Sequence, residues 1–453
     1  MPLDERAKKY GTPGQGQWRG RKASKLNNGD YSPNQSYHTE IHPSAAPKFA
    51  LIYSSRPSTV HFPKLVFAKN EQYDVLIYFK ANAFLLSKYV LQDISHCVIS
   101  PLRGEPHENT LHLSWNIARR FWYNLPLVCA DLPKLKWKDR VILAIGNLIR
   151  TYTLSTIESY RPKVVLCTID NSFDFQWISR RARDIDFAVI AQGPRDEINL
   201  TEEMPRAPPH PAAIYSIPHY FGWGQRDQKT LKKFGALIDQ FHSVGPLRAG
   251  YYVATRPSLK PAAYEICLVS QYVEGIMEKE LFPEIKRSLT LLHKYLKRYI
   301  SETGSRMVVA ARSTNQREID YFSRIFGCGI TIQRYNVEHF STYTAIDASE
   351  LVLAHDSSAA REAFWWGKKV LFTNYSGNPQ RSFFNTGPWL LEHPGYDQFK
   401  KQVDYLMSLS KEQFDAMANP VRAEQATLDP KRPAHAVLRS WVLEKITFVT
   451  APL

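Results

Sequence analysis

Two adjacent serines, Ser357 and Ser358, stand between an apolar run over 351–354 and a stretch with helical spacing that ends at Gly367. The apolar run is typical of a buried strand, and a serine at the start of a helix can cap its free backbone N–H groups. A strand that leads directly into a helix brings those N–H groups and the positive end of the helix dipole to one point. The pattern predicts an anion site, for which phosphate is the natural ligand. The alternative is that Ser357 only caps the helix.

Two further residues extend the predicted phosphate site along the same segment. His355 lies just before the serine pair, and Glu362 lies one helical turn beyond it. A carboxylate at that position could accept hydrogen bonds from the hydroxyls of a ribose. The alternative is that Glu362 is a simple surface charge.

Arg312 and Ser313 follow another apolar run, over 307–311. An arginine at the carboxyl end of a parallel strand suits a phosphate or carboxylate clamp, because guanidinium binds oxyanions in a bidentate way. The alternative is a surface ion pair. Together with the serine pair, Arg312 could hold the monophosphate or diphosphate of a nucleotide sugar.

The first half of the chain offers one candidate catalytic residue. Asp170 and Asn171 follow a strongly apolar run over 163–169. A carboxylate at the end of a buried strand that faces a cleft could be a nucleophile or a general base. The alternative is that Asp170 caps the helix expected over 173–183, and both roles are compatible.

The next apolar run, over 187–191, leads into Gln192, Gly193 and Arg195. Glycine lets a backbone approach a ligand closely, and Arg195 adds a cation. Farther along, His219 precedes an aromatic segment that could stack on a sugar ring, although core packing is the commoner role of such rings.

The elements that must position these residues alternate between strands and helices, which predicts two α/β domains with parallel sheets. Strands are expected over 49–53, 74–79, 163–169, 187–191, 264–270, 307–311, 330–333, 351–354 and 370–372. Helices are expected over 137–160, 281–302, 316–326, 396–409, 411–418 and 434–446. The predicted division is a mobile basic arm over 1–47, an irregular junction over 245–261 between domains 48–250 and 251–433, and a C-terminal helix over 434–453.

Composition limits the choice of partner and compartment. The chain has 453 residues, a net charge of +15 and a pI near 9.4, which favours an acidic partner: nucleic acid, anionic glycan, nucleotide or a negatively charged membrane face. Its basic residues are spread out and match no nucleic-acid-binding motif, so nucleic acid is not the expected partner. Five cysteines without a C-x-x-C pair favour a reduced compartment. With no visible secretory signal and no apolar run of about 18 residues, we expect a cytoplasmic protein that could touch a membrane surface.

Several motifs are absent from the sequence. It contains no G-x-G-x-x-G and no Walker A loop, which argues against NAD enzymes and P-loop NTPases. No D-x-D follows a predicted strand, which argues against a metal-dependent single-domain sugar transferase. A helix dipole, an arginine and serine hydroxyls could stabilise a departing nucleotide without a cation. We therefore expect neither a metal nor a cofactor.

Three segments resemble GT-B glycosyltransferases of bacterial surface-polysaccharide biosynthesis, such as those of capsule and O-antigen. They are V-V-L-C-T-I-D-N-S-F-D-F with A-Q-G-P-R, then F-H-S-V-G-P-L-R-A-G-Y-Y, then E-L-V-L-A-H-D-S-S-A-A-R-E-A-F-W-W-G-K-K-V-L-F. They cover roughly 163–374, and the third is the most family-like. The resemblance implies two Rossmann-like domains that face a cleft, with the C-terminal helix packed back on the first domain.

The resemblance also implies that the donor and the acceptor bind different domains. The donor nucleotide sugar would bind the second domain through the residues Arg312, Ser313, His355, Ser357, Ser358 and Glu362. The acceptor would bind the first domain through the residues Asn171, Gln192, Arg195 and His219. Retaining transferases of Kdo from a CMP donor are similar in placing a carboxylate near the anomeric carbon, which would make Asp170 the nucleophile. The His-Pro pair that such enzymes often carry after a donor-domain strand has no counterpart here.

The expected function is metal-independent transfer of a sugar from a nucleotide sugar, with CMP-Kdo as one option, to an anionic or lipid-linked surface glycan at the inner face of the membrane. Asp170 would deprotonate the acceptor in an inverting enzyme or attack the sugar in a retaining one. The alternatives are a glycerol-phosphate or polyol-phosphate transferase on the same fold, for which His219 is the candidate base, and a non-enzymatic protein that binds nucleic acid or another anionic polymer.

Overall fold

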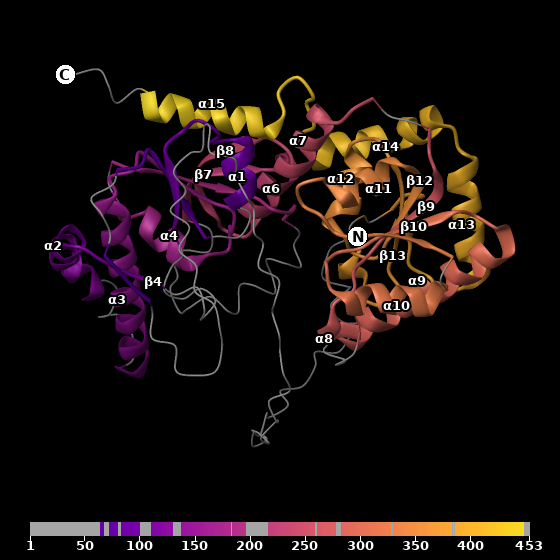
Figure 1. Cartoon of the computed structure of the whole chain (residues 1–453), viewed down its shortest axis with the longest axis horizontal. Coiled ribbons are helices and arrows are strands. Elements are labelled where there is room, and N and C mark those ends of the chain that lie inside the picture. Colours follow the sequence, from indigo (N-terminus) through magenta and orange to yellow (C-terminus); the bar gives the residue numbers. More distant parts are fainter. Residues whose placement is uncertain are drawn as a thin grey trace, which may run out of the picture. The chain divides into compact units, whose positions relative to one another are not determined.

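The computed structural model describes residues 64–67, 72–79, 83–99, 110–129, 137–182, 184–195, 216–258, 261–277, 282–327, 329–382, 384 and 386–447 (Figure 1). The arm predicted over 1–47 and the strand expected over 49–53 lie outside these residues. None of the helices within the described ranges combines the length and the apolar character that crossing a bilayer requires.

Two parallel six-stranded sheets dominate the fold. The first has the order β3-β2-β5-β6-β7-β8 and the second the order β11-β10-β9-β12-β13-β14. The strands of the first are β2 (Val75–Tyr78), β3 (His96–Ile99), β5 (Val164–Cys167), β6 (Asp186–Ile190), β7 (Ser216–Gly222) and β8 (Leu237–Ser243). Those of the second are β9 (Tyr264–Val269), β10 (Met307–Ala310), β11 (Thr331–Gln333), β12 (Ser349–Ala354), β13 (Lys369–Thr373) and β14 (Leu390–Leu391). Strands β1 (Lys64–Phe67) and β4 (Thr110–Leu113) form a separate parallel pair.

Helices connect and cover these strands. Those among the first set of strands are α1 (Ala83–Tyr89), α2 (Trp115–Asn124), η3 (Leu125–Cys129), α3 (Trp137–Ser159), α4 (Phe173–Ser179), α6 (Gln225–Lys233) and α7 (Leu247–Thr255). Those among the second set are α8 (Glu274–Met277), α9 (Pro283–Thr303), α10 (Gln316–Phe326), α11 (Ser341–Asp347), α12 (Ser358–Trp365) and η6 (Pro379–Arg381). The chain ends with α13 (Tyr396–Ser408), α14 (Lys411–Gln425) and α15 (Ala434–Thr447).

The central strands β2, β5, β9 and β12 contain continuous apolar stretches because both faces of each sheet are covered. Every residue of β5 is fully buried, and so are Ile266 and Cys267 of β9. Continuous burial of Val, Ile and Leu is what parallel sheets require. The α/β class predicted from the sequence, with two Rossmann-like domains, is confirmed.

The C-terminal helix returns to the first sheet, as predicted. Leu438 and Trp441 of α15 belong to the same buried cluster as the strands β2 and β5. Lys163, which precedes β5, donates from Nζ to the carbonyl oxygen of Ile446 at 2.7 Å. Figure 1 shows α15, in yellow, beside the strands of the first sheet.

The order of the strands shows where each sheet can bind a ligand. In the second sheet the chain moves outward from β9 to β11 and then returns to β12 on the other side of β9. In the first sheet it moves from β2 to β3 and returns to β5 on the other side of β2. Ligands of open α/β sheets bind outside the carboxyl ends of the strands at such a reversal. The two candidate ligand-binding edges are therefore β2/β5 and β9/β12.

One sequence expectation about the junction is wrong. The region 245–261, expected to be irregular, contains α7, which begins after Pro246 in extended backbone at φ −70° and ψ 123°. Proline is well suited to a helix start because its φ is already fixed there. Tyr252 of α7 donates from Oη to Asp347 of α11 at 2.7 Å, which links the helix to elements of the second sheet. The predicted boundary at 250/251 itself stays a prediction.

Gly245, between β8 and α7, should tolerate no side chain. Its φ is +82°, and a Cβ atom there would overlap the carbonyl oxygen of Thr427, in the segment that leads from α14 to α15. We expect Gly245→Ala to lower the free energy of unfolding by about 3 kcal/mol, from left-handed backbone strain and from overlap with the neighbouring chain. Urea unfolding measures this loss. Gly235→Ala is the matched control, because Gly235 has φ +79° but open space around it. Equal losses in the two variants would show that only backbone strain acts.

Candidate functional site

The turn between β12 and α12 is fixed by one side chain from the neighbouring strand. Gln271 follows β9, and its Oε1 accepts from the backbone N–H of His355 at 2.8 Å and of Asp356 at 2.7 Å. Its Nε2 donates to the carbonyl oxygen of Asp356. Gln271 therefore holds the loop that carries the predicted phosphate site, at the reversal between β9 and β12.

Helix α12 begins at the serine pair. Ser357 is the N-cap residue, with extended backbone at φ −128° and ψ 124°, and its Oγ accepts from the backbone N–H of Ala360 at 3.4 Å. Ser358 is the first residue of the helix. The capping role considered for Ser357 is thus confirmed. It is compatible with an anion site, since a cap satisfies only one of the four free N–H groups at a helix start.

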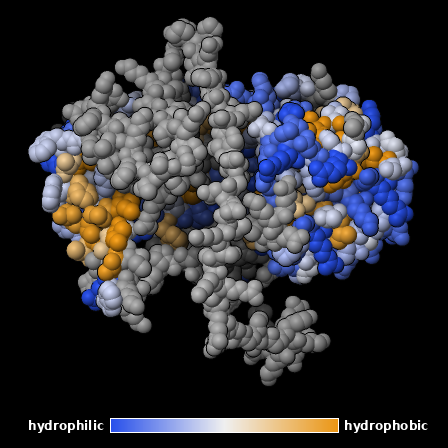
Figure 2. Space-filling view, turned by 60° about the horizontal axis from the view of Figure 1, so that its bottom comes forward, coloured by the Kyte–Doolittle hydropathy of each residue, from blue (hydrophilic) through white to orange (hydrophobic). Residues whose placement is uncertain are grey.

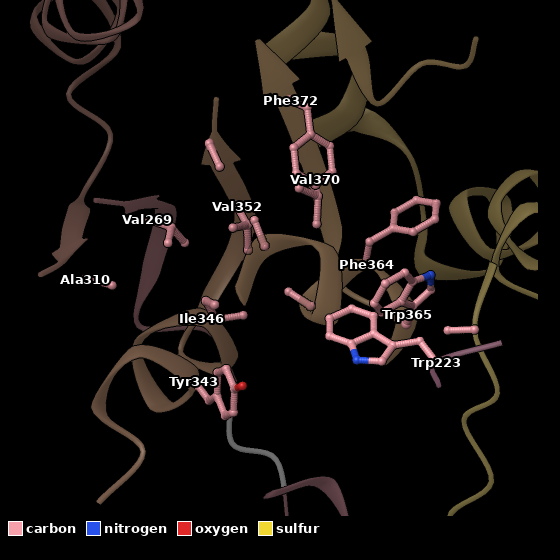
Figure 3. Packing of buried hydrophobic residues seen from close by; sticks show 14 of the residues in the cluster. Trp223, Val269, Ala310, Tyr343, Ile346, Val352, Phe364, Trp365, Val370 and Phe372 are labelled. Carbon is pink, nitrogen blue, oxygen red and sulfur yellow. The ribbon is translucent and has the colours of Figure 1, made fainter. Parts of the chain in front are cut away.

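A loop of the first sheet approaches this helix start. A Cβ atom added to Gly193, which follows β6, would lie 3.7 Å from Oγ of Ser358, at ordinary van der Waals distance. Trp223, which follows β7, packs edge-on against Trp365 of α12 with ring centroids 4.6 Å apart. Figure 3 shows these two indole rings side by side. The carboxyl edge of the first sheet therefore lies against α12 at both its first and its last residue.

Asp170 lies at the carboxyl edge of β5, at the reversal of the first sheet, and is 3% exposed. Arg195 donates to it from Nε at 2.5 Å to Oδ2 and from Nη2 to Oδ1. Tyr220 donates from Oη to Oδ2 at 2.7 Å. Burial and the nearby Asp170 carboxylate raise the pKa of Tyr220 well above its ordinary value, so its phenol remains a donor. Both carboxylate oxygens of Asp170 accept hydrogen bonds in this arrangement.

The alternative role for Asp170, as cap of the next helix, is wrong. The N-cap of α4 is Ser172, whose Oγ accepts from the backbone N–H of Phe175 at 3.3 Å. The carboxylate of Asp170 is turned instead to Arg195 and Tyr220, while its backbone oxygen accepts from Nε2 of Gln176 at 3.1 Å.

A second buried carboxylate shapes the loop that carries Arg195. Asp227 of α6 is 1% exposed. It accepts from the backbone N–H of Arg195 at 3.0 Å and from that of Trp223 at 2.9 Å. The residue therefore fixes the loops after β6 and β7 relative to each other.

Glu362 lies inside α12 and is buried. Tyr343 of α11 donates from Oη to its Oε2, and the side chain of Arg248 on α7 is near enough to act on its charge. Burial raises the pKa of Glu362 to about 7, against the opposing effects of the Tyr343 hydrogen bond and the Arg248 charge. The carboxylate therefore changes charge near neutral pH.

The turn after β10 is built around the buried Glu318. Its Oε1 accepts from Ser270 Oγ at 2.5 Å and from the backbone N–H of Arg312 at 2.8 Å. Its Oε2 accepts from the backbone N–H of Ser313 at 2.9 Å and from its Oγ at 2.6 Å. The hydroxyl of Ser313 is thus used within the turn, while the side chain of Arg312 is exposed.

Arg312 and the serine pair share one sheet edge without being adjacent. Strand β9 lies between β10 and β12. Neighbouring strands are about 4.8 Å apart, so the backbones after β10 and β12 are about 10 Å apart. A long arginine side chain can cover that separation toward a shared anion.

His355 lies beneath the loop and is 2% exposed. Its Nδ1 is 2.6 Å from the carbonyl oxygen of Thr373, which can only accept, so Nδ1 carries the proton. Ser288 Oγ lies 3.1 Å from the same nitrogen. Burial lowers the pKa of His355, which favours the neutral ring. The imidazole is therefore directed at β13 and α9.

The predicted acceptor residues separate into two places. Asn171 and Gln192 are exposed at the carboxyl ends of β5 and β6. His219 lies within β7, with Nε2 3.4 Å from Asp186 and its ring 4.9 Å from that of Trp441 on α15. Side chains alternate along a strand, so Tyr220 and not His219 points toward Asp170. The structure therefore does not bring His219 together with the other predicted residues.

Sequence reasoning left out several residues that build the site. They are Gln271, Glu318, Asp227, Arg248 and Tyr343. Each acts through a contact between segments that are distant in the sequence. The spacing of residues within a single segment does not predict such a contact. Within the described residues, no group of three or more His, Cys, Asp or Glu side chains is arranged to hold a metal ion.

No protein-family model matches the chain, and no curated protein matches it in sequence. Solved structures resemble the chain at low sequence identity. A putative UDP-N-acetylglucosamine 2-epimerase from Listeria monocytogenes is 13% identical over 84% of this chain and 98% of its own, with a TM-score of 0.47. The UDP-GlcNAc 2-epimerase from Neisseria meningitidis is 11% identical over 82% and 98%, also at 0.47. A glycosyltransferase from Rickettsia africae is 11% identical over 84% and 100%, at 0.44. At this level of likeness the function has to be argued from the residues of this chain.

Proposed function

We propose that this protein is a glycosyltransferase that uses a nucleotide sugar as donor and binds the donor phosphates at the N-terminus of α12. One observation carries the proposal. The start of α12, with Ser357 and Ser358, meets the loop after β6, which carries an arginine paired with a buried aspartate. The helix start that we propose binds an anion thus lies against the acid-bearing edge of the other sheet. Such an arrangement suits a reaction in which a nucleotide phosphate is the leaving group and a hydroxyl of the acceptor replaces it on the sugar.

The donor phosphates are the natural occupants of the helix start. Its free N–H groups and dipole attract anions, and the serine hydroxyls can donate further hydrogen bonds. Arg312, which follows β10, and Arg195, which follows β6, would add positive charge at the phosphates. Pre-arranged donors of this kind stabilise the charge that develops on a leaving diphosphate, so the reaction as proposed needs no metal and no cofactor.

Arg195 links donor binding to the catalytic residue. It occupies both oxygens of Asp170 in this structure and lies two residues from Gly193, where an added Cβ atom would be 3.7 Å from Oγ of Ser358. A phosphate bound at the helix start would compete with Asp170 for the guanidinium, because the planar guanidinium matches the geometry of both phosphate and carboxylate. Release of one carboxylate oxygen would let Asp170 deprotonate an acceptor hydroxyl or attack the sugar. The first course gives inversion at the anomeric carbon and the second gives retention.

The acceptor in this proposal is an anionic or lipid-linked surface glycan, held near the exposed Asn171 and Gln192. The net charge of +15 is compatible with such a substrate at the cytoplasmic face of a membrane. CMP-Kdo is one donor to test. A polyol-phosphate transferase would need His219 as base, and the position of His219 beneath α15 gives that alternative no support.

A thermal-shift screen with CMP, CDP, UDP, GDP and dTDP tests the proposal. A nucleotide at a hundredfold excess over its dissociation constant stabilises the folded chain by about 2.7 kcal/mol, which a melting curve detects easily. Ser358→Glu should abolish the shift, because a carboxylate at the helix start repels phosphate. Ser301→Glu, at an exposed position near the end of α9, is the matched control and should leave it unchanged. If no nucleotide shifts the wild-type curve, the proposal is wrong.

Gln271 should matter for nucleotide affinity although it need not touch the nucleotide. Gln271→Ala leaves the backbone N–H groups of His355 and Asp356 without their acceptor, and the phosphate loop loses its support. We expect affinity for the best nucleotide to fall about tenfold, as a lost buried hydrogen bond costs about 1–3 kcal/mol. Isothermal titration calorimetry measures this. Gln402→Ala, which removes a hydrogen bond to Pro388, is the control and should leave affinity unchanged.

A further inference from the structure

Helices α2 and α3 carry large apolar side chains that the rest of the described chain leaves exposed. Three belong to α2, namely Trp115, Trp122 and Tyr123, with exposed fractions of 82%, 71% and 86%. Four belong to the first half of α3, namely Trp137, Val141, Ile145 and Leu148, with exposed fractions of 70%, 50%, 55% and 43%. These seven residues are called the hairpin surface below. Figure 2 shows apolar side chains gathered at this edge of the molecule, in orange.

The hairpin surface is not needed to hold the two helices together. Arg120 of α2 pairs with Glu158 of α3 at 3.3 Å, and Asn124 donates to Ser155 at 3.2 Å. Asn147 donates to the carbonyl oxygen of Val128, so η3 is also tied to α3. Polar contacts and the buried half of α3 therefore fix the hairpin, while its apolar residues face away from them.

The spacing of the exposed residues is that of a helix face. Positions 137, 141, 145 and 148 in α3 recur at intervals of three and four, so they form one stripe along that helix. Trp115, Arg119 and Trp122 follow the same intervals in α2. A stripe of this kind is normally covered by another apolar surface, because its exposure to water is unfavourable.

The charge around the stripe indicates what covers it. Residues 115–148 contain six Lys or Arg against two Asp. Arg119 and Arg140 are exposed beside the apolar residues. A symmetric dimer would place this positive surface against itself, since a two-fold interface joins the same patch on both subunits. The covering surface therefore has to be apolar and anionic at once.

We propose that the hairpin surface binds the interface of an anionic lipid bilayer. The aliphatic stripe would enter the boundary between headgroups and acyl chains, where amphipathic helices lie. Tryptophan and tyrosine are enriched at that depth because their rings are apolar with one polar atom. The exposed arginines would contact the lipid phosphates. The inference concerns a surface separate from the sheet edges and does not depend on the identity of the donor nucleotide.

Vesicle sedimentation with the full chain tests the inference. Wild type should sediment with vesicles of phosphatidylcholine and phosphatidylglycerol at three to one and remain in the supernatant with phosphatidylcholine alone. Trp122→Ser with Tyr123→Ser should lose the binding, and tryptophan emission should no longer shift to the blue on adding vesicles. Arg119→Glu with Arg140→Glu should weaken partitioning by about thirtyfold or more, the effect of two basic residues at an anionic surface.

Matched variants on α9, at its N-cap and on α13 serve as controls. Phe282→Ser with Tyr405→Ser removes two aromatic side chains that are 46% and 43% exposed. Lys294→Glu with Lys297→Glu reverses two exposed charges on α9. Both should bind vesicles as wild type does, and all variants should retain wild-type melting temperatures and nucleotide shifts. Equal binding to neutral vesicles, or unchanged binding in the hairpin variants, would overturn the inference. A wild-type dimer that the aromatic variant converts to a monomer would overturn it in favour of a second copy.

Discussion

Replacement of Asp170 by asparagine is expected to lower the rate of sugar transfer by about hundredfold or more, the lower range of what an acid–base or nucleophilic group contributes. Asparagine keeps the size of the side chain and its bond from Tyr220, but it can neither take up a proton from the acceptor nor attack the sugar. Nucleotide affinity should not fall, because the phosphate site lies on α12 and Arg195 no longer has to leave a carboxylate to reach the phosphate. Turnover with the nucleotide sugar found by the screen, together with calorimetry, separates the two quantities.

A second buried ion pair supplies the control for Asp170. Asp174 of α4 pairs with Arg150 of α3 at 2.6 Å, a different partner from the Arg195 that pairs with Asp170. Asp174→Asn also removes one charge of a buried pair, so it reports the cost of breaking such a pair without the proposed chemistry. Equal turnover in wild type and Asp170→Asn would leave Asp170 as a residue that only positions Arg195.

Nucleotide affinity is expected to fall as the pH drops below about 7, by up to about tenfold for each pH unit. The cause is Glu362, whose pKa burial raises to about 7. Above that pH its carboxylate is ionised and can accept a ribose hydroxyl in addition to the bond from Tyr343, whereas below it a proton occupies one oxygen. Calorimetric titrations between pH 5.5 and 8.5 measure the profile.

The nucleotide phosphate also titrates near pH 6, so a variant must separate the two groups. Glu362→Gln cannot ionise and should retain only the dependence that belongs to the phosphate. If wild type and Glu362→Gln give the same profile, Glu362 takes no part in binding. The same pKa shift affects stability: the folded chain holds a proton between pH 4.5 and 7 that the unfolded chain has lost, so stability falls as the pH rises through that window.

The sequence was informative where a single segment carries the signal. The apolar runs before Asp170 and Ser357 predict β5 and β12, because strands buried on both faces have no polar positions to obscure them. The helix after the serine pair follows from capping chemistry and from the helical spacing that ends at Gly367. The sequence therefore indicates both sheet edges, the one after β5 and the one after β12.

The remainder of the site depends on contacts between distant segments. Gln271 acts on a loop more than eighty positions away. Arg248 acts on Glu362 from α7, a helix that was not predicted because proline and glycines lie within and around it. Because side chains alternate along β7, only one of His219 and Tyr220 can point toward Asp170. An apolar run alone does not show which face of a strand points toward the site. Such information exists only once the strands are ordered in a sheet.

The return of α15 to the first sheet has a consequence for biosynthesis. Arg439 donates to the carbonyl oxygen of Val90, a partner 349 positions earlier in the chain, and Trp441 shields strands made near the start. While the ribosome is still translating, that apolar face has no cover, so the nascent chain offers a target for chaperones until its last helix emerges. For the same reason, expression of the first α/β unit in isolation should yield soluble protein only when residues 434–447 are fused back on.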